Sequence, residues 1–170
     1  GMISAEAMTE LEARRLLYIL GVRERSDKLV RELVLTDAAP FVPLAMKRRG
    51  KEIDYEAKTV MLAGRRYIVC RNHQEAQKDA ADRASIVAAL ERQLAKGDKA
   101  LVGNTGFRRY LKTISNEHFA IDPDKIEEER KFDGIFVLRT NTDLNSLEAM
   151  LCYKQLWTVE TLFRTMKCQL

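Results

Sequence analysis

The sequence contains few cysteines and no pattern of metal-binding cysteines and histidines. Its three cysteines, Cys70, Cys152 and Cys168, lie far apart, and its two histidines, His73 and His118, stand alone. An odd and scattered set of cysteines argues against a disulfide framework, and no ligand spacing typical of zinc occurs. A reducing, cytoplasmic location is therefore expected.

Long apolar runs are also missing. No stretch approaches the roughly 20 apolar residues that a membrane-spanning helix requires, and the start of the sequence has no basic-then-apolar signal pattern. Apolar residues make up 46% and charged residues 32% of the 170 residues, which is typical of a globular domain. The formal net charge is +4 and the pI is near 9.0, so nucleic-acid binding is permitted but not required.

Hydrophobic periodicity and turn residues predict a mixture of helices and strands. Helices are expected at residues 4–15, 23–37, 73–96, 122–131 and from about 146 onward. Strands are expected at residues 16–22, 53–62, 66–71 and 135–138. The two middle strands form a β-hairpin around Gly64. Asn145 and Glu148 have the spacing of a capping box that opens the last helix. The expected fold class is α/β.

The last predicted helix has one chemically mixed face. At about 100° per residue, a narrow stripe along this face contains a phenol, a carboxylate and two cations. The members of the stripe are Tyr153, Leu156, Glu160, Arg164 and Lys167. The simplest interpretation is an amphipathic surface helix in which Glu160 pairs with Arg164 four residues later.

Two other basic segments are candidates for contact with phosphate. Residues 103–112 contain two glycines, which let a backbone approach a phosphate, together with aromatic residues and the cations Arg108, Arg109 and Lys112. A glycine-bearing turn that opens a short helix explains this segment equally well. Residues 47–51 read Lys-Arg-Arg-Gly-Lys, and a solvated basic turn is the simpler interpretation there.

The mixed stripe resembles the signature of a known family. Tyr153, Glu160 and Lys167 have the spacing of the Y-R-E-K signature of bacterial insertion-sequence transposases with a DDE catalytic triad. The run Phe-Asp-Gly-Ile-Phe-Val-Leu-Arg-Thr-Asn at 132–141 looks like the strand that leads into the signature helix. Residues 1–4 resemble the end of the family's Asp-Arg-Gly segment.

This resemblance implies the second half of a ribonuclease-H-like fold, interrupted by a mixed α/β insertion that carries the β-hairpin. Residues 1–22 and 132–170 would form the partial catalytic domain, and residues 23–131 the inserted subdomain. A strand within 132–139 would lie beside the strand at 16–22. If these two strands are not adjacent, an unrelated α/β protein whose last helix matches by chance would be favoured.

The resemblance also implies roles for the stripe. Glu160 would be the catalytic carboxylate and a ligand of the two Mg²⁺ or Mn²⁺ ions with which the family cleaves and joins DNA. The phosphates of the transposon ends would be contacted by Tyr153, Arg164 and Lys167. Trp157 would either stack near a base or pack in the core. Leu156 stands where the signature has Arg, and it cannot make that arginine's phosphate contact.

Two of the family's three catalytic carboxylates have no counterpart in this chain. We therefore expect a truncated transposase that does not cleave DNA by itself. The alternative is a DNA-binding or regulatory module, which forms a homodimer or pairs with full-length transposase through an unpaired sheet edge.

Overall fold

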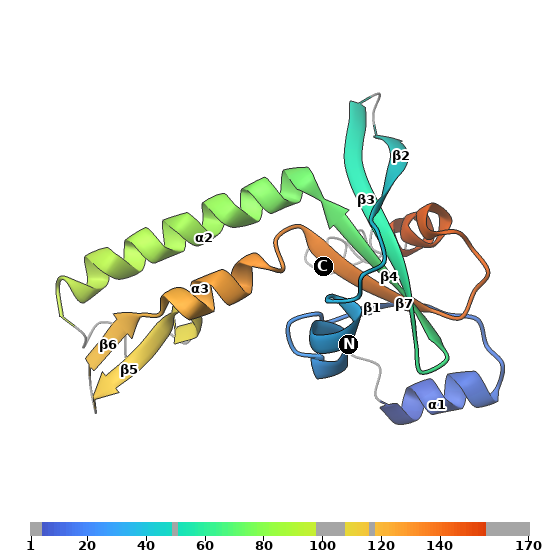
Figure 1. Ribbon diagram of the computed structural model, residues 1–170, viewed down its shortest axis with the longest axis horizontal. Coiled ribbons are helices and arrows are strands. Elements are labelled where there is room, and N and C mark those ends of the chain that lie inside the picture. Colours follow the sequence, from blue (N-terminus) through green and yellow to red (C-terminus); the bar gives the residue numbers. More distant parts are fainter. Residues whose placement is uncertain (1–4, 49–50, 98–107, 116–117, 156–170) are drawn as a thin grey trace, which may run out of the picture. The chain divides into compact units, whose positions relative to one another are not determined.

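The chain consists of two compact units. The computed structural model describes residues 5–48, 51–97, 108–115 and 118–155. Its secondary structure is mixed α/β, as predicted. The first unit comprises residues 1–71 and 136–170, and the second comprises residues 72–135 (Figure 1).

A five-stranded sheet forms the first unit. In spatial order its strands are β1 (Ile19–Val22), β7 (Ile135–Thr140), β4 (Arg65–Asn72), β3 (Lys51–Leu62) and β2 (Val42–Arg48). β1 pairs antiparallel with β7, and β2 pairs antiparallel with β3 (Figure 1). The sequence-based division assigned β2, β3 and β4 to the inserted subdomain. In the structure they belong to the same sheet as β1, because β4 lies between β3 and β7.

The first helix and the first strand are both shorter than predicted. α1 (Ala5–Ala13) is followed by Arg15 with φ 55°, and the amide of Leu16 donates to the carbonyl of Leu11 at 3.0 Å. This geometry is a left-handed helix cap. Leu16 and Leu17 were expected to begin the strand but are 48% and 75% exposed. Because residues 16–22 are apolar throughout, the sequence did not show which of them belong to the helix cap and which to the strand.

β3 and β4 form the predicted hairpin. Ala63 (φ 50°) and Gly64 (φ 72°) connect them, and both have the left-handed conformation that a type I′ turn requires. Further along the hairpin, Glu56 and Arg71 form a cross-strand ion pair at 3.3 Å. Local turn chemistry was therefore sufficient to predict this element.

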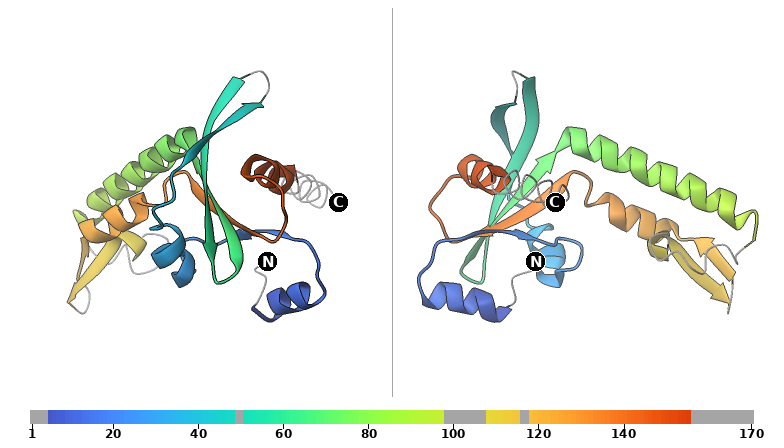
Figure 2. Two further views of the ribbon diagram at one scale, coloured as in Figure 1. Left: turned by 45° about the vertical axis from the view of Figure 1, so that its right-hand side comes forward. Right: turned by 180° about the vertical axis from the view of Figure 1, so that it is seen from behind.

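One face of the sheet is covered by the last helix, whose described residues are 146–155 (Figure 2). The buried cluster on this face consists of Tyr55, Ala57, Ile68, Cys70, Leu138, Ala149 and Met150. Ala149 and Met150 come from the helix, and the other members come from β3, β4 and β7. The helix is thus held on the sheet by apolar burial, which is the main source of stability for such contacts.

The segment between β1 and β2 is tied to the sheet by a buried lysine. Lys58 follows Ala57 in β3 and therefore lies on the opposite face. Its ammonium donates to the carbonyls of Leu35 and Asp37 at 3.0 and 2.6 Å. These carbonyls follow η1 (Val30–Val34), a short π-helix. The helix predicted at 23–37 is correspondingly limited to residues 28–34.

A long helix, a β-ribbon and a short helix make up the second unit. Its elements are α2 (His73–Leu94), η3 (Arg108–Tyr110), β5 (Leu111–Ser115), β6 (His118–Ile121) and α3 (Pro123–Arg130). Leu90 of α2, Tyr110 and Leu111 form its buried cluster. The predicted helices at 73–96 and 122–131 are confirmed. Asn72 and Asp122 cap their first turns through side-chain oxygens, as such residue types commonly do.

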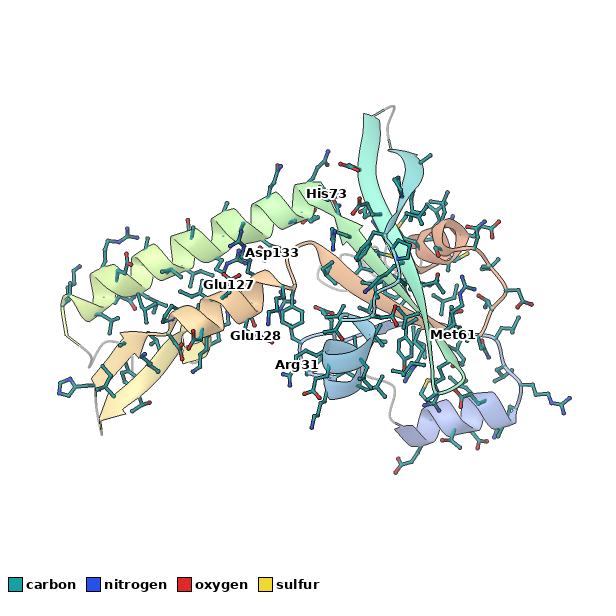
Figure 3. The ribbon with its side chains drawn as sticks, in the orientation of Figure 1. Arg31, Met61, His73, Glu127, Glu128 and Asp133 are labelled. Carbon is teal, nitrogen blue, oxygen red and sulfur yellow. The ribbon has the colours of Figure 1, made fainter. Side chains whose placement is uncertain are left out.

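Polar contacts join the two ends of the second unit. The amide of Asn72 donates to the carbonyl of Gly134 at 2.9 Å, and the amide of Gly134 donates to Asp79 at 2.9 Å. Asp133, which follows α3 (Figure 3), accepts two hydrogen bonds from Arg83 of α2, one of them at 2.6 Å. Both side chains of this ion pair are largely buried. An ion pair and hydrogen bonds therefore hold the first half of α2 against the segment that follows α3, a region called here the base of the unit.

Candidate nucleic-acid interface

The helix that carries the predicted stripe begins with the predicted capping box. The side chain of Asn145 accepts from the amide of Glu148 at 2.9 Å, and the side chain of Glu148 accepts from the amide of Asn145 at 2.9 Å. This reciprocal pair satisfies two amides at the start of the helix. The prediction is confirmed, and the first turn of the helix is fixed on the sheet.

Tyr153 is placed over the first strand of the sheet. It packs against the buried cluster under the helix and is itself half-buried. A Cβ added to Gly21 of β1 would overlap the hydroxyl of Tyr153 and lie 2.9 Å from its Cζ atom. Gly21 therefore provides the space that the phenol occupies. Only part of the ring is left for the DNA contact that the sequence predicted for Tyr153.

Lys154, the next residue, was not identified from the sequence. Its ammonium contacts the hydroxyl of Tyr55 and lies 3.9 Å from the centroid of that ring and 5.5 Å from the ring of Phe136. These are cation–π distances. Burial raises the pKa of the nearby Cys70 thiol to about 12, so this cysteine is neutral. The two aromatic residues lie on different strands, and sequence spacing gave no sign that they would meet at Lys154.

The remaining residues of the stripe lie outside the described residues. They are Leu156, Glu160, Arg164 and Lys167, and Trp157 also lies outside the described residues. Their roles remain predictions.

The second predicted cluster is partly engaged within its own unit. Arg109 forms an ion pair with Glu129 at 3.9 Å, and its guanidinium lies 4.7 Å from the ring of Tyr110. Lys112 is exposed on β5. The backbone of Arg108 belongs to η3, whereas the glycines at 103 and 106 lie outside the described residues. The structure thus leaves Lys112 as the more accessible cation of this cluster.

The excess positive charge of the protein belongs to the first unit. That unit contains 18 Lys and Arg against 13 Asp and Glu, whereas the second contains 11 against 12. The resulting charges, +5 and −1, add to the +4 of the whole chain. Acidic residues of α3, among them Glu127 and Glu128, contribute to the balance in the second unit (Figure 3). Attraction to a polyanion therefore favours the first unit.

The carboxylates of the described segments do not form a metal site. In residues 5–48, 51–97, 108–115 and 118–155, no three His, Cys, Asp or Glu side chains gather as ligands would. Glu12, the most strongly perturbed carboxylate, accepts two hydrogen bonds from Arg65, both at 2.9 Å, and one from the Tyr18 hydroxyl at 3.0 Å. The Arg65 hydrogen bonds, helped by Tyr18, lower the pKa of Glu12 to about 2. This carboxylate is already neutralised by protein partners.

No protein family, curated protein or solved structure matches this chain. Among the described helices, none combines the length and the apolar character needed to cross a bilayer. The functional assignment therefore rests on the residues themselves and on their placement.

Proposed function

We propose that this chain is part of the catalytic region of a DDE transposase, that it binds duplex DNA, and that it does not cleave DNA by itself. In this proposal the partial ribonuclease-H-like domain comprises β1, β7 and the signature helix, and β2, β3 and β4 extend the same sheet. Arg164 and Lys167 contact phosphates of the transposon end. Tyr153 contributes a half-buried phenol that also anchors the helix on β1.

The observation that carries the proposal is the pairing of β1 with β7 beneath the signature helix. The resemblance required a strand within 132–139 beside the strand at 16–22. Residues 19–22 pair with residues 137–140 in a continuous antiparallel register, and the helix that begins at residue 146 packs on the same sheet. A chance match of the last helix alone gives no reason for this neighbourhood.

The absence of cleavage follows from the number of carboxylates. A two-metal site polarises the phosphate and activates the attacking oxygen, and several carboxylates are needed to hold its ions. Glu160 is the one member of the triad that the resemblance assigns to this chain. We therefore propose no cleavage step for this chain alone.

Fluorescence anisotropy tests the binding part of the proposal. A labelled duplex is titrated with the protein at several salt concentrations, beside Arg164→Glu/Lys167→Glu and the charge-matched control Lys78→Glu/Arg92→Glu on exposed positions of α2. We expect salt-dependent binding, with a slope of about 0.9 per phosphate contact. The signature variant should weaken it much more than the control. Equal losses in the two variants would remove the signature helix from the interface.

A nicking assay tests the catalytic part. With Mg²⁺ or Mn²⁺ present, we expect the supercoiled substrate to remain intact. Cleavage that disappears in Glu160→Ala would show that this chain is a complete nuclease and would contradict the proposal.

A regulatory module that pairs with another transposase chain is the second candidate. The observation in its favour is that β1 is an edge strand of the described sheet, preceded by the exposed Leu16 and Leu17. An edge strand with apolar neighbours invites pairing with another chain. Light scattering over a range of concentrations separates this candidate from a monomer, because pairing through this edge makes the mass rise with concentration.

A further inference from the structure

Arg23 is an exposed cation at the end of β1. It follows Val22, the last residue of that strand, and its carbonyl accepts hydrogen bonds from the amides of Ser26 and Asp27 at 3.2 and 2.9 Å. The chain therefore turns away from the sheet directly after Arg23. The sequence predicted that a helix begins at this residue, whereas the structure places it at the end of an edge strand.

The carboxylates next to Arg23 in the sequence have other partners. Glu24 forms an ion pair with Arg25 at 2.8 Å, and the side chain of Asp27 accepts a hydrogen bond from the amide of Val30 at 3.2 Å. Within the part of the chain that the structure describes, the Arg23 side chain forms no ion pair or hydrogen bond. Such a cation can bind a phosphate without giving up an acidic partner.

Arg23 continues the face of the sheet on which the signature helix packs. Gly21 leaves the space that the Tyr153 hydroxyl occupies, so its α-carbon faces the helix. Positions two residues apart along a strand share a face, and Arg23 comes two residues after Gly21, roughly 7 Å farther along the chain. The register agrees, because the next pair of β1 and β7 would be Arg23 and Phe136. Phe136 packs against the buried cluster beneath the helix.

The described part of the signature helix runs toward this end of β1. Ser146 at the start of the helix lies 3.2 Å from Thr59 of β3, hydroxyl to hydroxyl. Farther along the helix, the Lys154 ammonium contacts Tyr55 of β3 and lies 5.5 Å from the ring of Phe136. Phe136 is near the start of β7, and the antiparallel register places the start of β7 beside the end of β1.

We propose that Arg23 contacts the phosphate backbone of duplex DNA and takes the place of the arginine that the signature helix lacks. The inference rests on the proposed function and deepens it by adding a contact site. This sequence has Leu156 where the signature has its arginine, so the helix contributes one cation fewer. A duplex carries one charge per about 1.7 Å of its axis, so a backbone that reaches Tyr153 also offers phosphates within roughly 7 Å. Arg23 recognises this charge and positions the duplex without reading its sequence.

The test is the anisotropy titration with Arg23→Gln. Arg15→Gln is the matched control, because Arg15 is exposed, belongs to the same unit and precedes β1 instead of following it. Each change removes one positive charge. Arg23→Lys keeps the charge, and Leu156→Arg in the Arg23→Gln background returns an arginine to the signature position. Circular dichroism and thermal melting establish that each variant is folded.

We expect Arg23→Gln to reduce the salt slope by about 0.9, the value for one phosphate contact, and to weaken binding roughly eightfold near 0.1 M salt. Arg15→Gln and Arg23→Lys should stay near the wild-type slope, and Leu156→Arg should restore the affinity lost in Arg23→Gln. A loss that Leu156→Arg does not restore would show that Arg23 does not replace the signature arginine.

The same titrations separate failure of this inference from failure of the proposed function. If Arg23→Gln binds like Arg15→Gln while the signature variant loses affinity, the contact at Arg23 is refuted and the proposed function stands. If the wild-type protein fails to bind at low salt, both proposals are overturned.

Discussion

At the scale of single residues, Arg15 is held in a backbone conformation that favours glycine. It has φ 55° at the end of α1, and the left-handed region costs a residue with a side chain about 1–2 kcal/mol. Arg15→Gly should therefore raise the free energy of unfolding by about 1 kcal/mol. Denaturant unfolding measures the change. Ala7→Gly, at an exposed position within α1, is the control and should lower stability, so a loss in both variants would contradict the cap assignment.

The Glu12 carboxylate makes stability depend on pH in an acidic window. The pKa of Glu12 is lowered from 4.5 to about 2, first by its hydrogen bonds from Arg65 and then by Tyr18. A carboxylate whose folded pKa is depressed stabilises the protein above its unfolded pKa, and this stabilisation is lost as pH falls through the window between the two values. Glu12→Gln should be less stable than the wild type at pH 6, and the difference should shrink toward pH 2. Urea unfolding at several pH values measures it, and a constant difference would contradict the ion-pair explanation.

At the scale of elements, the base of the second unit depends on the absence of a side chain at Gly134. This residue has φ 63°, and an added Cβ would overlap the carbonyl oxygen of Asn72 and lie 2.8 Å from the amide nitrogen of Ala76. Gly134→Ala combines backbone strain with a clash against backbone atoms, and we expect a loss of roughly 3 kcal/mol. Gly64→Ala is the matched control, since Gly64 has φ 72° and nothing within 4 Å of the added Cβ. The control should lose only about 1 kcal/mol. Equal losses would show that close packing at Gly134 is unimportant.

Elements that depend on local signals were predictable from the sequence, whereas their partners in the sheet were not. The capping box at Asn145, the helix from His73 and the hairpin around Gly64 each follow from residues within a few positions of one another. β2 was missed because Pro43 was interpreted as a break. It is an edge strand, where a missing amide is tolerated. The strand order and the contact of Lys154 with Tyr55 depend on residues far apart in the sequence. Hydrophobic periodicity carries no information about which distant residues meet.

At the scale of the whole molecule, the separation of charge between the units predicts where a polyanion binds. From the sequence, the stripe of the last helix was the main candidate for DNA contact, and the cluster at Arg108, Arg109 and Lys112 was a weaker second candidate. The second unit, however, has a net charge of −1, and Arg109 is engaged by Glu129 and Tyr110. A cation that already has an acidic partner gains less from a phosphate, because it must give up that partner.

We therefore expect Arg109→Glu/Lys112→Glu to leave the salt slope for duplex DNA near the wild-type value. Charge reversals at Arg164 and Lys167 in the first unit should reduce the slope by about 0.9 for each phosphate that the variant no longer binds. The two double variants change the net charge equally, so a general electrostatic effect would alter both titrations alike. If the slope falls only in Arg109→Glu/Lys112→Glu, the DNA interface lies at β5 and η3. The excess charge of the first unit would then need another explanation.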